Sequence, residues 1–363
     1  MSINFIFFVL QCMQVMKYIF FYEIIFQEWR YEMSYENYIG HPSQTTGVEE
    51  YRLIGGKGDG MRLFQIRNGK GLDLTISVDR CADISRINFQ GSNMNYFSPC
   101  GYTSPQYYDK EGFEFLKSFY CGFLTTCGLG TIGSPSADGG KNYPLHGNIS
   151  HIPAEHIYYI EKEDVIEIHA RIVDASIFNY KLALERIISC SKKENLLTVK
   201  DIVKNEGTNA EPIMLLYHIN IGYPLLDENA ELAVSSSNVL PRDERANENL
   251  NEWNKMLPPE PNFSEQCYYH YFNQKKAVAK IYNRNIDKGL AISFDTDTLP
   301  LMTEWKMMGN RDYVLGLEPC TNQLEGRSEI HKRNELSYLN PGESRAFGFE
   351  VRFTNCKDEW VKF

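Results

Sequence analysis

Apolar and polar residues alternate one by one along much of this chain, beginning with the segment 72–79, which reads LDLTISVD. A period of two, combined with β-branched residues, is typical of a strand that buries one face and exposes the other. A chain that repeats this pattern must fold mainly into sheets.

The pattern recurs at short intervals, with Gly, Asn and Pro between the segments. Residues 156–172 predict two strands around a turn at 162–164. Further strands are predicted at 180–189, 196–203, 213–221, 277–282, 290–294, 313–317 and 346–353. The 23 Tyr and 21 Phe residues also favour strands. We find no convincing long amphipathic helix, so the sequence predicts an all-β fold, a large antiparallel sandwich.

The body of the chain contains no internal repeat, low-complexity tract or linker that would divide it. The polar stretch 243–264 is flanked by strand patterns of the same kind, so we predict a surface loop there and not a domain boundary. Residues 33–363 are therefore expected to form a single domain, which is within the usual size range of such sandwiches.

The first 32 residues differ from the rest because residues 1–26 are crowded with Phe, Ile, Tyr and Met. Polar residues interrupt this stretch too often for a transmembrane helix, and the features of a signal peptide are missing. We expect translation to begin at Met33, which makes residues 1–32 an upstream leader outside the fold. The alternative is that residues 1–26 are a real interfacial anchor; without it, no membrane contact is expected.

Composition excludes several classes of function. The 37 basic and 47 acidic residues give a net charge of −10, which would repel a phosphate backbone, so nucleic-acid binding is not expected. The nine cysteines show no Cys-x-x-Cys spacing, which favours reduced thiols in a cytoplasmic protein. We find no dinucleotide fingerprint, Walker motif or metal-ligand spacing, so we expect neither a cofactor nor a metal.

Three short segments carry polar residues that invite a functional interpretation. The first is YPLHGNIS, where His146 follows a glycine-rich stretch and precedes Gly147, so the backbone can bend closely around a ligand. The alternative is a loop histidine that only hydrogen bonds to the backbone. The second is LYHINI, where His218 and Asn220 share one face of a strand. A core histidine satisfied by a neighbour remains the alternative.

The third segment is YVLGLEPCTN, where Val314, Gly316 and Glu318 share a face and Pro319 is expected to end the strand. Gly316 leaves space beside the Glu318 carboxylate, which is costly to bury unless it is paired or used. Arg80 is a charged residue in a similarly apolar setting. It continues the apolar face of the strand before it and should point to the interior or to a cleft.

Taken in order, LHGNISHIPAEH, YHINIGYPLLD and GLEPCTN resemble motifs of the aldose 1-epimerase-like (galactose mutarotase-like) family, in a less characterised branch. The resemblance covers most of the chain from about Met33 and includes VDRCADIS and EWKMMGNRDYVLGLEP. The YHINIGYP segment departs from the standard motif, which is closer to His-x-Tyr-Phe-Asn-Leu. The resemblance implies a β-supersandwich of antiparallel sheets whose concave face binds a sugar.

The resemblance also implies roles for individual residues. Glu318 would be the general base that takes the anomeric proton, and His218 the general acid that protonates the ring oxygen. His146 would hold the ring oxygen or a neighbouring hydroxyl. Implied or plausible substrate contacts are Arg80, Asp83, Asn220, Trp305, Lys306 and Asn322. A base and an acid on opposite sides of one hemiacetal are what ring opening requires, without a metal or nicotinamide.

The sequence therefore predicts an isomerase that interconverts the α and β anomers of an aldose or an aldose derivative. A sugar phosphate or sulfonate stays open as the substrate, because Arg80 and Lys306 would suit an anion. A non-catalytic sugar-binding or regulatory protein on the same scaffold is the main alternative. A carbohydrate lyase or hydrolase is a third possibility. The sequence names neither the sugar nor the oligomeric state.

Overall fold

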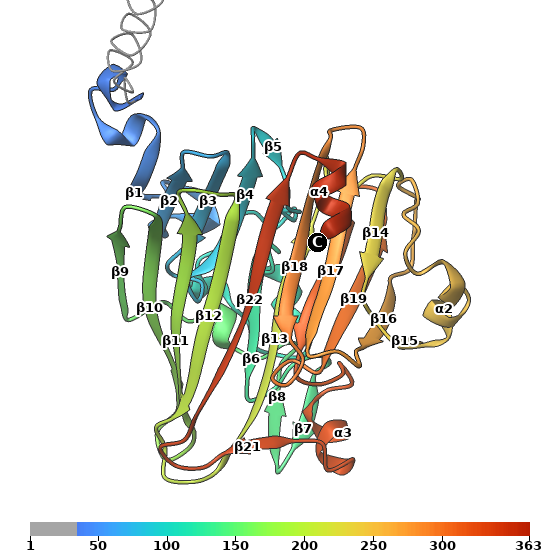
Figure 1. The fold of residues 1–363 in the computed structure, drawn as a ribbon. Helices are drawn as coiled ribbons and strands as arrows, with labels where there is room; N and C mark the ends of the chain where they lie inside the picture. The colour runs from blue at the N-terminus through green and yellow to red at the C-terminus, as the bar shows by residue number, and fades with distance from the viewer. Residues whose placement is uncertain (1–34) are drawn as a thin grey trace, which may run out of the picture. The chain divides into compact units, whose positions relative to one another are not determined.

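The computed structural model describes residues 35–363 (Figure 1) and confirms the predicted all-β fold. The chain divides into two units after Thr45. The described part of the first unit holds two short 3₁₀ helices, η1 (Tyr35–Tyr38) and η2 (Pro42–Gln44). Residues 46–363 form the second compact unit, which carries the sheets. The leader predicted at residues 1–32 lies outside the described residues and stays a prediction.

The largest sheet has eight strands, and every pair of neighbours in it is antiparallel. Its order is β14 (Ala230–Val234), β17 (Lys276–Asn283), β18 (Lys288–Asp295), β22 (Ser344–Thr354), β12 (Leu196–Asn205), β11 (Lys181–Ser191), β10 (Val165–Ala175) and β9 (His156–Glu161).

A seven-stranded sheet lies behind it in Figure 1. Its order is β15 (Asn238–Pro241), β16 (Gln266–Tyr271), β19 (Leu301–Met308), β20 (Tyr313–Cys320), β13 (Glu211–Ile221) and β21 (Ser337–Leu339), and β6 (Leu124–Leu129) also pairs with β13. A five-stranded sheet consists of β1 (Thr46–Arg52), β2 (Arg62–Asn68), β3 (Leu72–Ser77), β4 (Asp83–Phe89) and β5 (Ser92–Asn93). A small hairpin joins β7 (Ser136–Asp138) and β8 (Lys141–Tyr143).

Helices are few and short in the part of the second unit that the structure describes. They are η3 (Gly56–Gly58), η4 (Pro105–Tyr107), η5 (Glu114–Lys117), η6 (Ile149–His151), α2 (Glu244–Asn247), η7 (Leu250–Glu252), α3 (Arg327–Lys332) and α4 (Lys357–Lys362). Among residues 35–363, no helix is both long enough and apolar enough to span a bilayer.

The main core lies between the sheets and follows from the alternation in the sequence. Buried side chains of β10, such as Ile168, meet odd-numbered side chains of β13, such as Leu215 and Ile219, in one apolar cluster. Even-numbered residues of β13 leave on the other face, where Leu216 joins a separate small cluster. His218 is also even-numbered, so the period of two directs it away from the main core.

The predicted strands are confirmed within two or three residues at their ends. Pro319 does not end its strand as expected, because β20 continues to Cys320 and Pro319 pairs with Met302 of β19. The polar stretch 243–264 contains only α2 and η7 and connects β15 to β16, as expected of an excursion between strands.

Asp174, near the end of β10, gives a pH-dependent prediction. Burial raises the pKa of its carboxyl from 3.8 to about 6, although the Tyr180 hydroxyl donates to it at 3.0 Å. Between pH 4 and pH 6 the folded protein keeps this proton, whereas the unfolded chain has already released it. The stability that protonated Asp174 contributes is therefore full below pH 4 and is lost as the pH rises through 6. At about 1.4 kcal/mol for each pKa unit, ionised Asp174 costs roughly 3 kcal/mol at pH 7.5. We expect Asp174→Asn to raise the free energy of unfolding in urea at pH 7.5.

At pH 4 this gain should disappear, because wild-type Asp174 is then protonated in the folded protein. The matched control is Asp297→Asn, since Asp297 is mostly exposed and its ion pair with Lys275 should contribute little. A gain from Asp174→Asn that stays the same at both pH values would contradict the prediction.

Candidate active site

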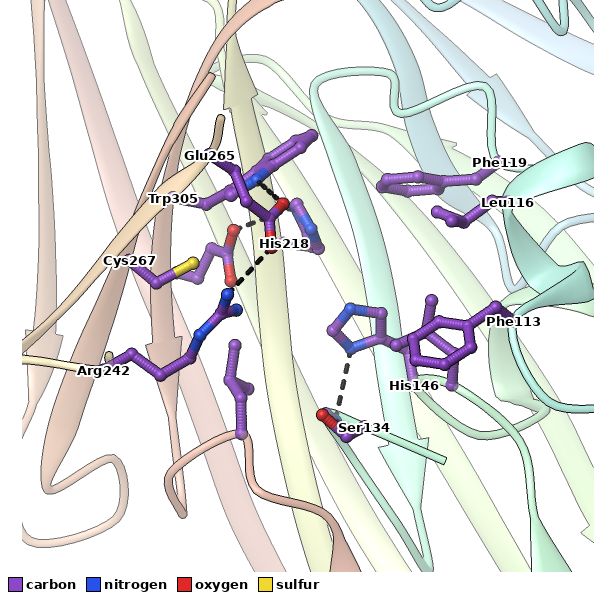
Figure 2. Close-up of a pocket in the computed structure, with 14 residues that line it drawn as sticks. Phe113, Leu116, Phe119, Ser134, His146, His218, Arg242, Glu265, Cys267 and Trp305 are labelled. Atoms are coloured by element: carbon purple, nitrogen blue, oxygen red, sulfur yellow. Dashed lines mark hydrogen bonds and ion pairs between the residues drawn. The ribbon is translucent and has the colours of Figure 1, made fainter. Parts of the chain in front are cut away.

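A cavity of about 400 Å³ opens on the face of the seven-stranded sheet that points away from the main core. This volume falls in the range of roughly 300–1,000 Å³ that is typical of small-molecule sites. The cavity (Figure 2) is lined by Phe113, Leu116, Phe119, Gly133, Ser134, Leu145, His146, His218, Arg242, Glu265, Cys267, Trp305, Glu318 and Leu324.

Two neighbouring strands supply a carboxylate and an imidazole to the cavity. Strands β13 and β20 pair with Ile219 opposite Leu317, and these two residues point into the main core. The side chains of the adjacent residues His218 and Glu318 therefore both point to the cavity. Glu318 Oε1 lies 3.3 Å from His218 Nδ1, and both side chains are buried.

Gly316 makes room for the Glu318 carboxylate, as the sequence predicts. A Cβ atom at Gly316 would lie 2.2 Å from Glu318 Oε1 and 3.0 Å from the Cβ of Trp305. Trp305 is opposite Gly316 on β19. The absence of a side chain at this one position thus determines where the carboxylate sits.

Glu318 is in an unusual electrostatic environment. Within the described part of the chain, neither of its carboxylate oxygens has a hydrogen-bond partner. Burial raises the pKa of Glu318 well above its usual value, the charge of Glu265 acts in the same direction, and Arg242 opposes both. Burial lowers the pKa of His218 well below its usual value, and His146 adds to this shift. Both shifts favour the uncharged forms of the two groups.

A tight glycine-rich loop presents His146 to the same cavity. His146 has a left-handed backbone (φ 58°), and a Cβ at Gly147 would lie 2.2 Å from the Gly128 carbonyl oxygen. The backbone N–H of Gly133 donates to His146 Nδ1 at 3.4 Å, which leaves Nε2 as the donor of the neutral ring. Burial lowers the pKa of His146 to about 4. Its ring centre lies 5.5 Å from that of His218.

An ion pair forms another part of the wall. Arg242 Nη2 donates to Glu265 Oε1 at 2.9 Å and to Asp243 Oδ2 at 3.1 Å. The other Glu265 oxygen accepts from Trp305 Nε1 at 2.8 Å. Figure 2 shows Arg242, Glu265 and Trp305 across the cavity from Phe113, Leu116 and Phe119. Carboxylate and guanidinium groups fixed in this way can orient a polar ligand.

Four of the residues singled out in the sequence meet in this cavity, namely Glu318, His218, His146 and Trp305. They come from four different segments, and Trp305 lies edge-on to His218 with ring centres 5.4 Å apart. Among residues 35–363, no group of three or more His, Cys, Asp or Glu side chains is arranged to hold a metal ion.

The two basic residues expected to bind an anion lie elsewhere. Arg80 points to the interior, where its guanidinium donates to the carbonyls of Ser150, Thr103 and Ser118 and contacts His151 Nε2 at 3.0 Å. Arg80 thus links η6, the residue that follows η5 and the loop at Thr103. Lys306 is on the opposite face of β19 from Trp305, and its ammonium donates to the carbonyls of Glu252 and Trp253.

The remaining three predicted substrate contacts also form ion pairs or hydrogen bonds inside the protein. Asp83 pairs with the buried Arg186. Asn220 donates to the carbonyls of Gly122 and His218. Asn322 donates to the Glu335 carbonyl. None of the three lines the cavity.

Arg242 and Glu265, which flank the polar excursion 243–264, were not predicted from the sequence. Arg242 follows β15 and Glu265 precedes β16, and the pairing of these two strands brings both residues to the cavity. A charged residue at each end of an excursion between strands is the signal that could have found them. The apolar wall of Phe113, Leu116 and Phe119 was missed because the segment shows no strand pattern.

Comparison with known proteins supports the fold. A Klebsiella pneumoniae protein described as a proposed aldose 1-epimerase is 25% identical, with a TM-score of 0.81 over 87% of this chain and 85% of that one. A galactose mutarotase-like protein of Clostridium acetobutylicum is 15% identical, with a TM-score of 0.60 over 86% and 99%. A galactose 1-epimerase of Lactobacillus acidophilus NCFM is 13% identical, with a TM-score of 0.55 over 85% and 99%.

These likenesses confirm the galactose mutarotase-like β-supersandwich that the motifs predicted. No curated protein matches the sequence. One family model matches residues 58–353, which is most of the chain. The chain therefore belongs to the family described as a domain of unknown function, DUF4432.

Proposed function

We propose that this protein is an aldose 1-epimerase that interconverts the α and β anomers of an aldose by acid/base opening and re-closure of the ring. The observation that carries the proposal is the buried pair of Glu318 and His218, 3.3 Å apart in a cavity of sugar-binding size. A buried carboxylate that has no hydrogen-bond partner among the described residues is unfavourable unless a ligand uses it.

In the proposed reaction, one member of the pair takes the proton of the anomeric hydroxyl while the other protonates the ring oxygen. The bond from C1 to the ring oxygen breaks and a free aldehyde forms. Rotation about the C1–C2 bond and re-closure give the other anomer. His146, with Nε2 as its donor, would hold the ring oxygen or a neighbouring hydroxyl. Trp305 would cover an apolar face of the sugar.

The shifted pKa values of Glu318 and His218 add a detail to this reaction. Because burial favours the uncharged forms of both groups, Glu318 would act as the base after a proton has moved from it to His218. The pair gives one proton and takes one in each turnover, so its total proton content is unchanged. Such a pair can serve both directions of the interconversion, which an epimerase requires.

The test is anomer exchange measured by NMR saturation transfer on a panel of aldoses with the purified protein. The proposal expects faster exchange for at least one sugar. Saturable sugar binding without any acceleration would instead favour the non-catalytic sugar-binding protein, which the same cavity could also support.

We also propose a cytoplasmic location. All eight cysteines between residues 35 and 363 are free thiols, and six of them are buried. Unpaired cysteines in this number are typical of a reducing compartment.

Gly316→Ala is expected to slow anomer exchange by about 100-fold, the effect that a displacement of about 1 Å can have on a catalytic group. The added methyl would lie 2.2 Å from Glu318 Oε1, so the carboxylate must turn away from His218. The side chain can move, so the melting temperature should fall only slightly. Exchange rates and thermal unfolding of the same preparation check both parts.

Gly130→Ala is the matched control for this substitution, because its new methyl would meet only Arg327 Nη1, at 3.5 Å. We expect its exchange rate to stay within about twofold of wild type. If Gly316→Ala exchanged sugar as fast as Gly130→Ala, the position of the Glu318 carboxylate would not matter to the reaction.

A further inference from the structure

The cavity has two walls of different chemistry (Figure 2). Arg242, Glu265 and the acid/base pair supply polar atoms on one side. Phe113, Leu116 and Phe119 supply only hydrocarbon on the other side, and Leu145, which packs in one cluster with Phe119, extends this surface. We call these four side chains the apolar wall.

Two members of the apolar wall expose much of their hydrocarbon surface to water, which costs free energy unless a ligand covers it. Phe113 is 62% exposed and Leu116 is 53% exposed, and they lie at the start of η5 and inside it. The buried Phe119 and Leu145 continue the surface into the cavity. Apolar side chains gathered at the mouth of a cavity are typical of a site that covers them with an apolar part of its ligand.

The charges of the polar wall disfavour an anionic ligand. Among the described residues that line the cavity, Arg242 is the one basic side chain with a permanent charge, and Glu265 and Asp243 already neutralise it. Arg80 and Lys306 use their donors on backbone carbonyls outside the cavity. A phosphate or sulfonate would therefore meet the negative charge of Glu265 without a free cation to balance it.

We propose that the substrate is an uncharged aldose with a deoxygenated carbon, whose C–H or methyl group packs on the apolar wall. This inference rests on the proposed function, because it names the substrate class of the same site. A hydroxyl against the apolar wall would lose its hydrogen bonds to water without gaining others, whereas a methyl group would gain contact. The acid/base pair still requires a free anomeric hydroxyl.

The experiment compares matched sugars by NMR saturation transfer with the full-length protein. The panel holds glucose and galactose, the 2-deoxy and 6-deoxy form of each, and the 6-phosphate and 6-deoxy-6-sulfonate of glucose. At least one deoxy sugar should exchange about tenfold faster than its parent, the discrimination that one methyl group gives in an apolar pocket. Both anionic sugars should be at least tenfold slower than glucose. Parents that match or outpace every deoxy form, or an anionic sugar that is fastest, would overturn the inference.

A failure of the proposed function looks different, since no sugar would then exchange faster. In that case the dissociation constants of the same panel, measured by calorimetry, decide the substrate class on their own. Tighter binding of a deoxy sugar than of its parent supports the inference. Equal or reversed affinities, or no binding at all, overturn it.

Two variants test the walls separately. Leu116→Ser should reduce the preference for a deoxy sugar over its parent, and Tyr107→Ser is the control because Tyr107 is half exposed on η4 and does not line the cavity. Glu265→Gln should raise the relative rate or affinity for the 6-phosphate, since it removes a negative charge but keeps an acceptor for Trp305. An unchanged preference in both variants would contradict the role of the two walls.

Discussion

Glu318→Gln should reduce the rate of anomer exchange by a factor of about 10²–10⁴, the contribution that a positioned general acid or base makes. Glutamine has nearly the same shape as glutamic acid, and burial, which raises the pKa of Glu318, favours the uncharged form of its carboxyl. The fold and the affinity for sugar should therefore survive the substitution, while proton transfer is lost. Saturation-transfer exchange rates and sugar dissociation constants measure the two effects.

Glu304→Gln is the matched control because Glu304 is also fully buried, on the neighbouring strand β19. Its carboxylate faces away from the cavity and contacts His270 Nε2 at 3.0 Å. We expect Glu304→Gln to exchange sugar at nearly the wild-type rate once the folded fraction is corrected for. A Glu318→Gln variant that exchanges as fast as Glu304→Gln would remove Glu318 from the proposed mechanism.

Strands buried on one face were the easiest to predict from the sequence. Of the strands buried on both faces, β13 and β20 were predicted, whereas β16 and β19 were not. Strand β10 alternates between buried and partly exposed residues, so its period of two is visible. Strand β16 reads QCYYHY and is buried along nearly its whole length, so alternation disappears. Strand β19, LMTEWKMM, was missed for the same reason, because Glu304 and Lys306 find buried partners inside the protein.

Only the cavity residues that lie in short sequence motifs were predictable. Glu318, His218 and His146 stand out because each is a polar residue in an apolar or glycine-rich setting. Arg80 stands out for the same reason, but its donors are consumed by the carbonyls of two loops, which no local pattern reveals. A buried polar residue in a sequence thus indicates that a partner exists, and long-range packing decides whether that partner is a ligand or the backbone.

Arg186→Met is expected to lower the free energy of unfolding by roughly 3–5 kcal/mol, the usual effect of removing one member of a buried ion pair. Arg186 on β11 is almost fully buried and donates to Asp201 Oδ1 and Oδ2 at 2.9 and 2.7 Å, and to Asp83 Oδ1 at 2.6 Å. Asp201 belongs to β12 and Asp83 to β4, so this one guanidinium links two sheets. Its loss leaves two carboxylates buried without a countercharge, although Thr126 still donates to Asp83 and Tyr217 to Asp201. Urea unfolding at pH 7.5 measures the effect.

Arg171→Met on the adjacent strand β10 is the matched control. Arg171 forms ion pairs with three glutamates near solvent, where such pairs contribute about 0–1 kcal/mol each. If the cause is uncompensated charge, replacing both aspartates by asparagine in the Arg186→Met background should recover part of the lost stability. Equal losses in Arg186→Met and Arg171→Met would mean that the buried network is no more important to the fold than a surface ion pair. Asp83, which the motifs suggested as a substrate contact, would then need another explanation for its burial.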